Sequence, residues 1–114
     1  MRVIIAGSRS ITDYQIVEEA VKESGLEISV VISGAARGVD RLGEEYALRH
    51  GILLERYPAD WDKHGRSAGY VRNTEMAGKA DALIASMDKE GSNGTKHMIQ
   101  EANKRGLIVH VKLV

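Results

Sequence analysis

The chain has 114 residues, a length typical of one domain. Its 16 Lys and Arg side chains balance 16 Asp and Glu side chains, which argues against a histone-like or polybasic role. Cysteine is absent, so disulfides, zinc-thiolate sites and thiol catalysis are excluded. There is no apolar run of roughly 18 residues, as a membrane span requires, and no signal-peptide pattern. We therefore expect one cytoplasmic domain over residues 1–114, without a membrane partner.

Short apolar runs alternate with helical patterns along the chain. Strands are predicted at 3–6, 29–33, 53–57, 82–85 and 107–111, and helices at 12–24, 39–50, 67–79 and 95–105. The first helix is expected to begin with a capping box formed by Thr12 and Gln15. Loops are expected at 58–65 and 86–94. This alternation predicts an α/β fold, a minimal Rossmann-like three-layer sandwich with a five-stranded parallel sheet and four helices.

Clusters of glycine, serine and arginine lie next to the predicted strand ends. Residues 7–10 (GSRS) follow the first strand, residues 33–40 (SGAARGVD) follow the second, and residues 91–95 (GSNGT) precede the last helix. Parallel sheets bind ligands beyond the carboxyl ends of their strands, so we expect these three loops to converge on one rim. Glycines let a ligand approach the backbone closely, and a helix N-terminus binds phosphate. The loops therefore favour a phosphate-bearing ligand.

Charged residues in these segments favour a nucleotide. Arg9, Arg37 and Arg72 are predicted to bind phosphate oxygens. Asp40 is predicted either to accept hydrogen bonds from a ribose hydroxyl or to hold an arginine, and its place at the start of a helix also has a purely structural explanation. Neither a Gly-x-Gly-x-x-Gly motif after the first strand nor a P-loop motif is present. This argues against an ordinary NAD enzyme and against a P-loop NTPase.

Aromatic and histidine residues offer further candidates. Trp61, the single Trp, lies in the 58–65 segment, where it either stacks on a base or packs beneath the loop. His97 lies beside the proposed phosphate loop, although a solvated helix histidine is the preferred interpretation. The four histidines fall in four different predicted elements, so we expect no metal site and no cofactor.

The same segments resemble the SLOG superfamily over nearly the whole chain. Residues 3–9 (VIIAGSR) resemble its opening strand and turn, and residues 31–40 (VISGAARGVD) resemble a Ser-Gly-x-Ala-x-Gly-hydrophobic-Asp block that the DNA-processing protein DprA shares. Residues 59–61 (ADW), 69–73 (GYVRN) and 92–95 (SNGT) resemble later motifs of the small stand-alone YspA- and YpsA-type subgroup, which occurs in bacteria and their phages. The chain is identified as similar to members of that subgroup.

The resemblance implies a nucleotide or nucleotide-derived ligand, for example an ADP-ribose-like compound, at the strand ends. A role as sensor, sequestering protein or binding module is expected, and a homodimer is typical of relatives, although no feature of the sequence fixes the oligomeric state. Together with the loop argument, the resemblance gives these predicted ligand-binding residues: Gly7, Ser8, Arg9, Ser33, Gly34, Arg37, Gly38, Asp40, Trp61, Arg72, Asn73, Ser92, Gly94 and Thr95.

Two alternative functions stay open on the sequence alone. LOG enzymes of the superfamily hydrolyse the N-glycosidic bond of a nucleotide and carry a Pro-Gly-Gly-x-Gly-Thr-x-x-Glu motif. Here Met98 stands where that Glu is expected, and the Pro-Gly-Gly part is not kept. A hydrolase would need Arg72 to hold phosphate and Glu75 or Glu101 as the acid-base carboxylate. The other alternative is DprA-like binding of single-stranded DNA, and the zero net charge makes nucleic acid the less favoured partner.

Overall fold

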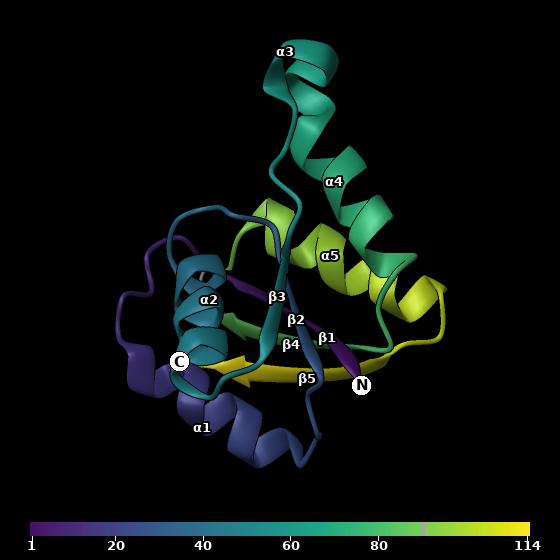
Figure 1. The fold of residues 1–114 in the computed structure, drawn as a ribbon. Coiled ribbons are helices and arrows are strands. Elements are labelled where there is room, and N and C mark those ends of the chain that lie inside the picture. The colour runs from purple at the N-terminus through teal and green to yellow at the C-terminus, as the bar shows by residue number, and fades with distance from the viewer. Residues whose placement is uncertain (90) are drawn as a thin grey trace.

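Five parallel strands form one sheet in the order β3-β2-β1-β4-β5 (Figure 1). The computed structural model describes residues 1–89 and 91–114, and residue 90, in the segment expected to be a loop at 86–94, lies outside the described residues. The strands are β1 (Arg2–Gly7), β2 (Val30–Ser33), β3 (Leu53–Arg56), β4 (Ala82–Met87) and β5 (Ile108–Leu113). The helices are α1 (Tyr14–Ser24), α2 (Val39–Arg49), α3 (Trp61–His64), α4 (Ala68–Ala77) and α5 (Asn93–Lys104), with a 3-10 turn η1 (Gly65–Ser67).

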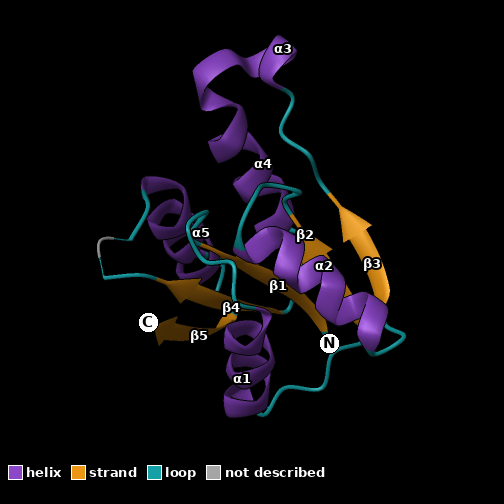
Figure 2. Cartoon of the chain, turned by 90° about the vertical axis from the view of Figure 1, so that its left-hand side faces the viewer, coloured by secondary structure: helices purple, strands orange, loops and turns teal. Residues whose placement is uncertain are grey.

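Helices cover both faces of the sheet (Figure 1, Figure 2). Successive side chains of a strand point to opposite faces, so Val3 and Ile5 pack with α1 and α2, whereas Ile4 and Ala6 pack with α4 and α5. These four side chains are buried, as expected for a strand enclosed on both sides. The α/β three-layer sandwich predicted from the sequence is confirmed.

Two local predictions need correction. Helix α1 is capped by Asp13, whose carboxylate accepts a hydrogen bond from the Gln15 amide at 3.0 Å, so the capping box expected at Thr12 is wrong. A carboxylate at this position both satisfies a free amide and interacts favourably with the helix dipole. The four predicted helices correspond to α1, α2, α4 and α5. The segment predicted as a loop at 58–65 contains the additional single turn α3, where the Asp60 carboxylate accepts a hydrogen bond from the Lys63 amide at 3.0 Å.

Helix α3 lies at the far end of α4, away from the sheet and beyond the end of β3, in both views (Figure 1, Figure 2). This position leaves the Trp61 side chain 54% exposed. Among the described residues, none of the helices combines the length and the apolar character that crossing a bilayer requires.

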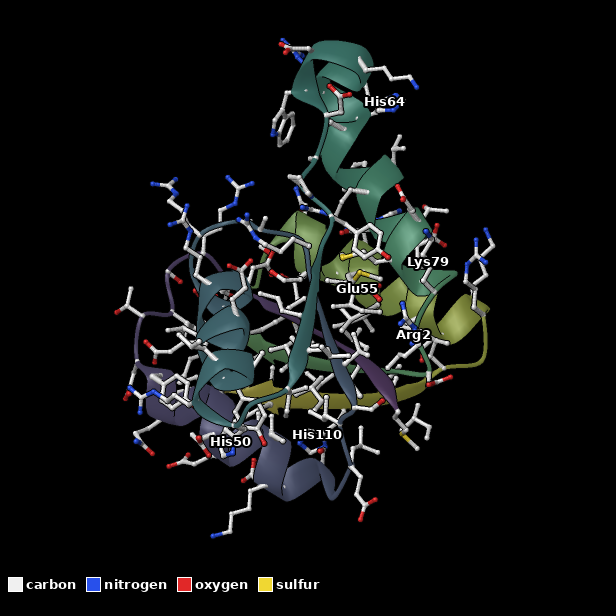
Figure 3. All side chains as sticks on the ribbon, viewed as in Figure 1. Arg2, His50, Glu55, His64, Lys79 and His110 are labelled. Atoms are coloured by element: carbon white, nitrogen blue, oxygen red, sulfur yellow. The ribbon has the colours of Figure 1, made fainter. Side chains whose placement is uncertain are left out.

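Arg2 connects the start of β1 to β3 and to the loop before β4 (Figure 3). Its Nη1 and Nη2 atoms donate to the two carboxylate oxygens of Glu55 at 2.9 and 2.6 Å, and its Nε donates to the carbonyl of Lys79 at 2.7 Å. The Tyr57 hydroxyl also donates to Glu55, at 2.8 Å. The hydrogen bonds from Arg2 and then Tyr57 lower the pKa of Glu55 to about 2.

Replacing Arg2 by Gln is expected to raise the pKa of Glu55 from about 2 towards its ordinary value, because the main donor to the charged carboxylate is removed while Tyr57 remains. The stabilisation from this pair is present above the ordinary carboxyl pKa and is lost as the pH falls towards 2. NMR titration of the side-chain carboxyl of Glu55 in both proteins measures the change. An unchanged pKa in the Arg2→Gln protein would show that Tyr57 alone sustains the shift.

Candidate functional site

A pocket of about 210 Å³ lies at the carboxyl end of β1. The strand order reverses between β1 and β4, because β2 and β3 lie on one side of β1 whereas β4 and β5 lie on the other. In doubly wound sheets a crevice opens at this reversal. We call the pocket at the carboxyl end of β1 the Asp40 pocket. Its lining residues are Ala6, Gly7, Arg9, Ala36, Asp40, Arg72, Asn73, Met76, Ser92, Gly94, Thr95 and Met98.

A second pocket, of about 360 Å³, adjoins the first. We call it the Trp61 pocket, and its lining residues are Arg9, Gly34, Ala35, Ala36, Arg37, Arg41, Pro58, Ala59, Trp61 and Arg72. Arg9, Ala36 and Arg72 line both pockets, so the two form one continuous surface. Taken together, the two pockets, of about 210 and 360 Å³, have a volume within the range of roughly 300 to 1,000 Å³ in which small-molecule sites occur.

The loops after β1 and β2 touch at Gly38. This residue has φ 75° and ψ −130°, and a Cβ atom there would lie 2.3 Å from the Ser8 carbonyl oxygen and 2.5 Å from the Cα of Arg9. Only glycine adopts such a backbone conformation readily, and only glycine leaves room for the first loop. The Val39 amide also donates to the Ser8 carbonyl at 3.3 Å. Gly38 therefore sets the position of Arg9 relative to α2.

The carboxylate of Asp40 faces the pocket at the start of α2. The side chain is 6% exposed, and its Oδ2 atom accepts a hydrogen bond from the Ala36 amide at 3.1 Å. Burial raises the pKa of Asp40 to about 6, opposed by that amide and by the charge of Arg72. Among the residues that the structure describes, none donates a hydrogen bond to its Oδ1 atom. One carboxylate oxygen is thus left for a ligand.

Arg72 and Asn73 connect α4 to the other walls of the site. Arg72 donates from Nη1 to the Gly34 carbonyl and from Nε to the Asn73 side-chain oxygen at 3.0 Å. Asn73 is buried and donates to the Gly94 carbonyl at 3.1 Å, and its amide nitrogen lies 3.2 Å from Nδ1 of His97. Burial lowers the pKa of Arg72, and the charge of Asp40 opposes this. Asn73 therefore fixes the guanidinium of Arg72 relative to the first turn of α5.

Helix α5 begins directly at the pocket. Ser92 caps it, because its hydroxyl accepts a hydrogen bond from the Thr95 amide at 3.1 Å and donates one to the Thr95 hydroxyl at 2.6 Å. Gly94 follows in the first turn and lines the Asp40 pocket. The first amides of a helix lack partners within the helix and favour an anion, and the dipole adds to this preference. This wall of the pocket suits a phosphate group.

Three further arginines surround the pockets without protein partners. Arg9, Arg37 and Arg41 are exposed, and none of their side chains makes a hydrogen bond or ion pair with any residue in the described ranges 1–89 and 91–114. Among the described residues that line the Trp61 pocket, none is Asp or Glu. The chain is neutral as a whole, yet this surface carries a concentrated positive charge.

Arg41 was not among the residues predicted from the sequence. It lies in the first turn of α2, next to the pocket residue Asp40. A positive charge in the first turn opposes the helix dipole, so Arg41 does not stabilise α2 through the dipole, and this unfavourable placement is the signal in the sequence that could have drawn attention to it.

The structure brings most of the predicted site residues together, but not all of them. Ser8 and Ser33 are buried and support the loops, and neither they nor Gly38 line the Asp40 or the Trp61 pocket. The Ser8 hydroxyl accepts from the Asp88 amide at 3.2 Å, and the Ser33 hydroxyl donates to Glu44 at 2.7 Å. Trp61 lines the pocket named after it.

The residues considered for acid-base catalysis or as a secondary ligand contact lie elsewhere. Glu75 is exposed, and Glu101 accepts a hydrogen bond from the Thr74 hydroxyl at 2.5 Å. The ring of His97 packs against that of Tyr70, with centroids 4.4 Å apart. Glu75, Glu101 and His97 are absent from the lining of the Asp40 and Trp61 pockets. Among the described residues, the one carboxylate in the lining of the Asp40 and Trp61 pockets is that of Asp40.

Comparisons with known proteins agree with the fold and motifs. The chain is 34% identical over 119 residues to the Gene 61 protein of Mycobacterium phage D29, covering 95% of this chain and 93% of that protein. Its fold is similar to the X-ray structure of DNA processing protein A (DprA) from Streptococcus pneumoniae, with a TM-score of 0.73 and 17% identity. That match covers 96% of this chain and 49% of the DprA chain, so this chain spans about half the length of DprA. The profile of the YspA, cpYpsA-related SLOG family (YAcAr) matches residues 1–64, more than half of the chain, and the chain therefore belongs to this family.

Proposed function

We propose that this protein binds a nucleotide or a nucleotide-derived ligand across the Asp40 and Trp61 pockets, as a sensor, sequestering protein or binding module. The observation that carries the proposal is the set of four arginines, Arg9, Arg37, Arg41 and Arg72, around one continuous surface. Guanidinium groups bind phosphate oxygens in pairs of hydrogen bonds, and the start of α5 adds backbone amides. Membership of the SLOG family and the DprA-like fold support a role related to nucleotides or nucleic acids.

Native mass spectrometry and thermal unfolding with a panel of nucleotides test the proposal. A ligand at one hundred times its dissociation constant stabilises the folded state by about 2.7 kcal/mol, which is a readily measured change. We expect at least one nucleotide to add its intact mass and to raise the unfolding temperature. No retained mass and no thermal shift with any member of the panel would contradict the proposal.

Replacing Gly94 by Ala is expected to separate binding from folding. A Cβ atom at Gly94 has no described atom within 4 Å, and alanine is favoured over glycine inside a helix by about 1 kcal/mol. The variant should therefore fold at least as stably as the wild type. The added methyl group lines the Asp40 pocket and occupies space that a ligand phosphate needs, so we expect at least about tenfold weaker binding. Calorimetric titration and thermal unfolding of both proteins measure the two effects, and unchanged affinity would place the ligand away from α5.

Binding is favoured over N-glycosidic hydrolysis because of where the carboxylates lie. Glu75 and Glu101, the candidates for the acid-base role, do not line either pocket. A general acid or base must reach the reacting atom within hydrogen-bond distance. Incubation with nucleoside monophosphates is expected to release no free base, and chromatography of the mixture measures this. Base release that disappears in the Glu101→Gln protein would instead support the hydrolase.

Binding of single-stranded nucleic acid is a second candidate. The exposed indole of Trp61 beside unpaired arginines is the combination that stacks bases and contacts phosphates in such proteins. The similarity to the fold of a DNA processing protein points in the same direction. A gel shift with single-stranded oligonucleotides at increasing salt tests it, because binding that rests on phosphate contacts weakens steeply with salt. A shift that is absent at low salt would remove this candidate.

A further inference from the structure

Asn73 lies buried where α4 packs against α5, and two partners fix the orientation of its side-chain amide (Figure 1). The Nε atom of Arg72 can only donate a hydrogen bond, so the atom that it meets at 3.0 Å is the amide oxygen, Oδ1. The carbonyl of Gly94 can only accept, so the atom that it meets at 3.1 Å is the amide nitrogen, Nδ2. The two partners require opposite atoms of the amide, and they therefore leave it one orientation.

This orientation determines which nitrogen of His97 carries a proton. Nδ2 of Asn73 can only donate, and it lies 3.2 Å from Nδ1 of His97. Nδ1 must therefore accept, which is possible only in a neutral imidazole that carries its proton on Nε2. Nε2 faces Oε1 of Glu101 at 4.0 Å, and the ring packs against that of Tyr70. The neighbours of His97 thus select both its tautomer and its ring position.

A second proton on His97 is incompatible with this arrangement. An imidazolium carries N–H groups on both nitrogens, so its Nδ1 would face the Asn73 amide donor to donor. Turning the amide over would place Nδ2 against Nε of Arg72 and Oδ1 against the Gly94 carbonyl, which replaces two hydrogen bonds by two repulsive contacts. Arg72 and Gly94 both line the Asp40 pocket. Protonation of His97 therefore disturbs two walls of the pocket.

Solvent protons can reach His97, because its side chain is 24% exposed. Imidazole is the side chain that ordinarily gains a proton near physiological pH. The Thr74 hydroxyl donates to Glu101 and lowers the pKa of that carboxyl, so Glu101 is charged and attracts an imidazolium, whereas the contact with Asn73 opposes it. The titratable and charged groups around the ring belong to both packed helices: Tyr70 and Arg72 of α4, and Glu101, Lys104 and Arg105 of α5.

We infer that His97 is a positioning residue: as a neutral acceptor it holds the Asn73 amide, and through it Arg72 and Gly94, in the arrangement that binds the ligand, and its protonation weakens binding. His97 does not line the Asp40 or the Trp61 pocket, so it acts through Asn73 and not by touching the ligand. The inference rests on the proposed function and specifies how protons regulate that site. By linkage, bound ligand weakens the binding of a proton to His97 by the same factor.

NMR titration of the free protein tests the positioning. At pH 8 we expect His97 to carry its proton on Nε2 and none on Nδ1. As the pH falls, the side-chain amide signals of Asn73 should shift with the same midpoint as the imidazole signals. His97→Asn places an oxygen acceptor that does not titrate near the position of Nδ1, so the shift at Asn73 should disappear. A proton on Nδ1 at pH 8, or an Asn73 amide that does not respond to His97, would overturn the inference whether or not a ligand is present.

Calorimetric titration with ADP-ribose at pH 8 and pH 5.5 tests the regulation, because the two phosphates of this probe keep a constant charge over that range. Burial raises the pKa of Asp40 to about 6, so all proteins compared carry Asp40→Asn, which removes this second titration. The parent is expected to lose at least about fivefold in affinity at pH 5.5. With His97→Asn added the affinity should be the same at both pH values, and with His97→Leu, which removes the acceptor, it should be low at both.

His64→Gln serves as the matched control, because His64 lies on α3 outside the Asp40 and Trp61 pockets. It should lose affinity at pH 5.5 by the same factor as the parent. An equal loss in the parent and in the His97→Asn protein would overturn the inference, and so would undiminished affinity of the His97→Leu protein at pH 8. If neither ADP-ribose nor any nucleotide of the panel binds, the proposed function fails, and the NMR titration by itself still decides whether His97 holds Asn73.

Discussion

Replacing Asp40 by Asn is expected to stabilise the protein at pH 8 by about 3 kcal/mol. Burial raises the pKa of Asp40 from 3.8 to about 6, so the folded state disfavours the ionised carboxylate that the unfolded state carries freely. Between pH 4 and pH 6 the folded protein keeps a proton that the unfolded chain releases, and wild-type stability falls as the pH rises through this window. Urea unfolding of both proteins at pH 4 and pH 8 measures the difference, which should be small at pH 4.

A matched replacement on the surface serves as the control. Asp62 is exposed on α3, so Asp62→Asn is expected to change the stability by less than about 0.5 kcal/mol at either pH. Lower stability of Asp40→Asn at pH 8 would mean that the attraction of Arg72 and Arg9 outweighs the cost of burial. The expected gain in stability of Asp40→Asn bears on function. A buried charge that destabilises the fold beside a pocket is typical of a binding or reactive site.

Much of the fold could be predicted from local patterns. The apolar run at the start of the chain is buried on both faces, and such a run indicates a parallel sheet between helices. The strand order was not predicted, because the pattern of apolar residues does not specify which strands are neighbours. Leu53 illustrates this: the sequence places it in an apolar strand, whereas the position of β3 at the edge of the sheet leaves it 73% exposed.

Part of the candidate site follows from motif and chain order, and part depends on tertiary contacts. Residues 7–10 and 33–40 follow neighbouring parallel strands, so their proximity is a consequence of the topology. The direction in which Glu101 points is a property of how α4 packs on α5, where it meets Thr74. No local pattern encodes that contact. Sequence reasoning could therefore place the rim and name Asp40 on it, but it could not decide whether Glu75 or Glu101 faces the same rim.

Replacing Gly38 by Ala is expected to destabilise the protein by about 3 kcal/mol and to abolish nucleotide binding. The added Cβ atom would lie 2.3 Å from the Ser8 carbonyl oxygen and 2.5 Å from the Cα of Arg9, and neither backbone atom can move without shifting the loop after β1. The φ of 75° adds backbone strain for any residue with a side chain. Since Arg9 and Arg37 lie on the two loops that would separate, both are displaced from the pockets. Urea unfolding and calorimetric titration measure the two losses.

Gly25→Ala isolates the contribution of backbone strain. Gly25 ends α1 with φ 67° and ψ 10°, and a Cβ atom there has no described atom within 4 Å. Its replacement should cost only about 1 kcal/mol, the usual penalty for a left-handed conformation, and should leave ligand affinity unchanged. The additional loss in Gly38→Ala then measures the contact between the two loops. Equal losses of stability in the two variants would mean that the contact between the two loops contributes little to stability. The positions of Arg9 and Arg37 would then depend on the ligand rather than on the fold.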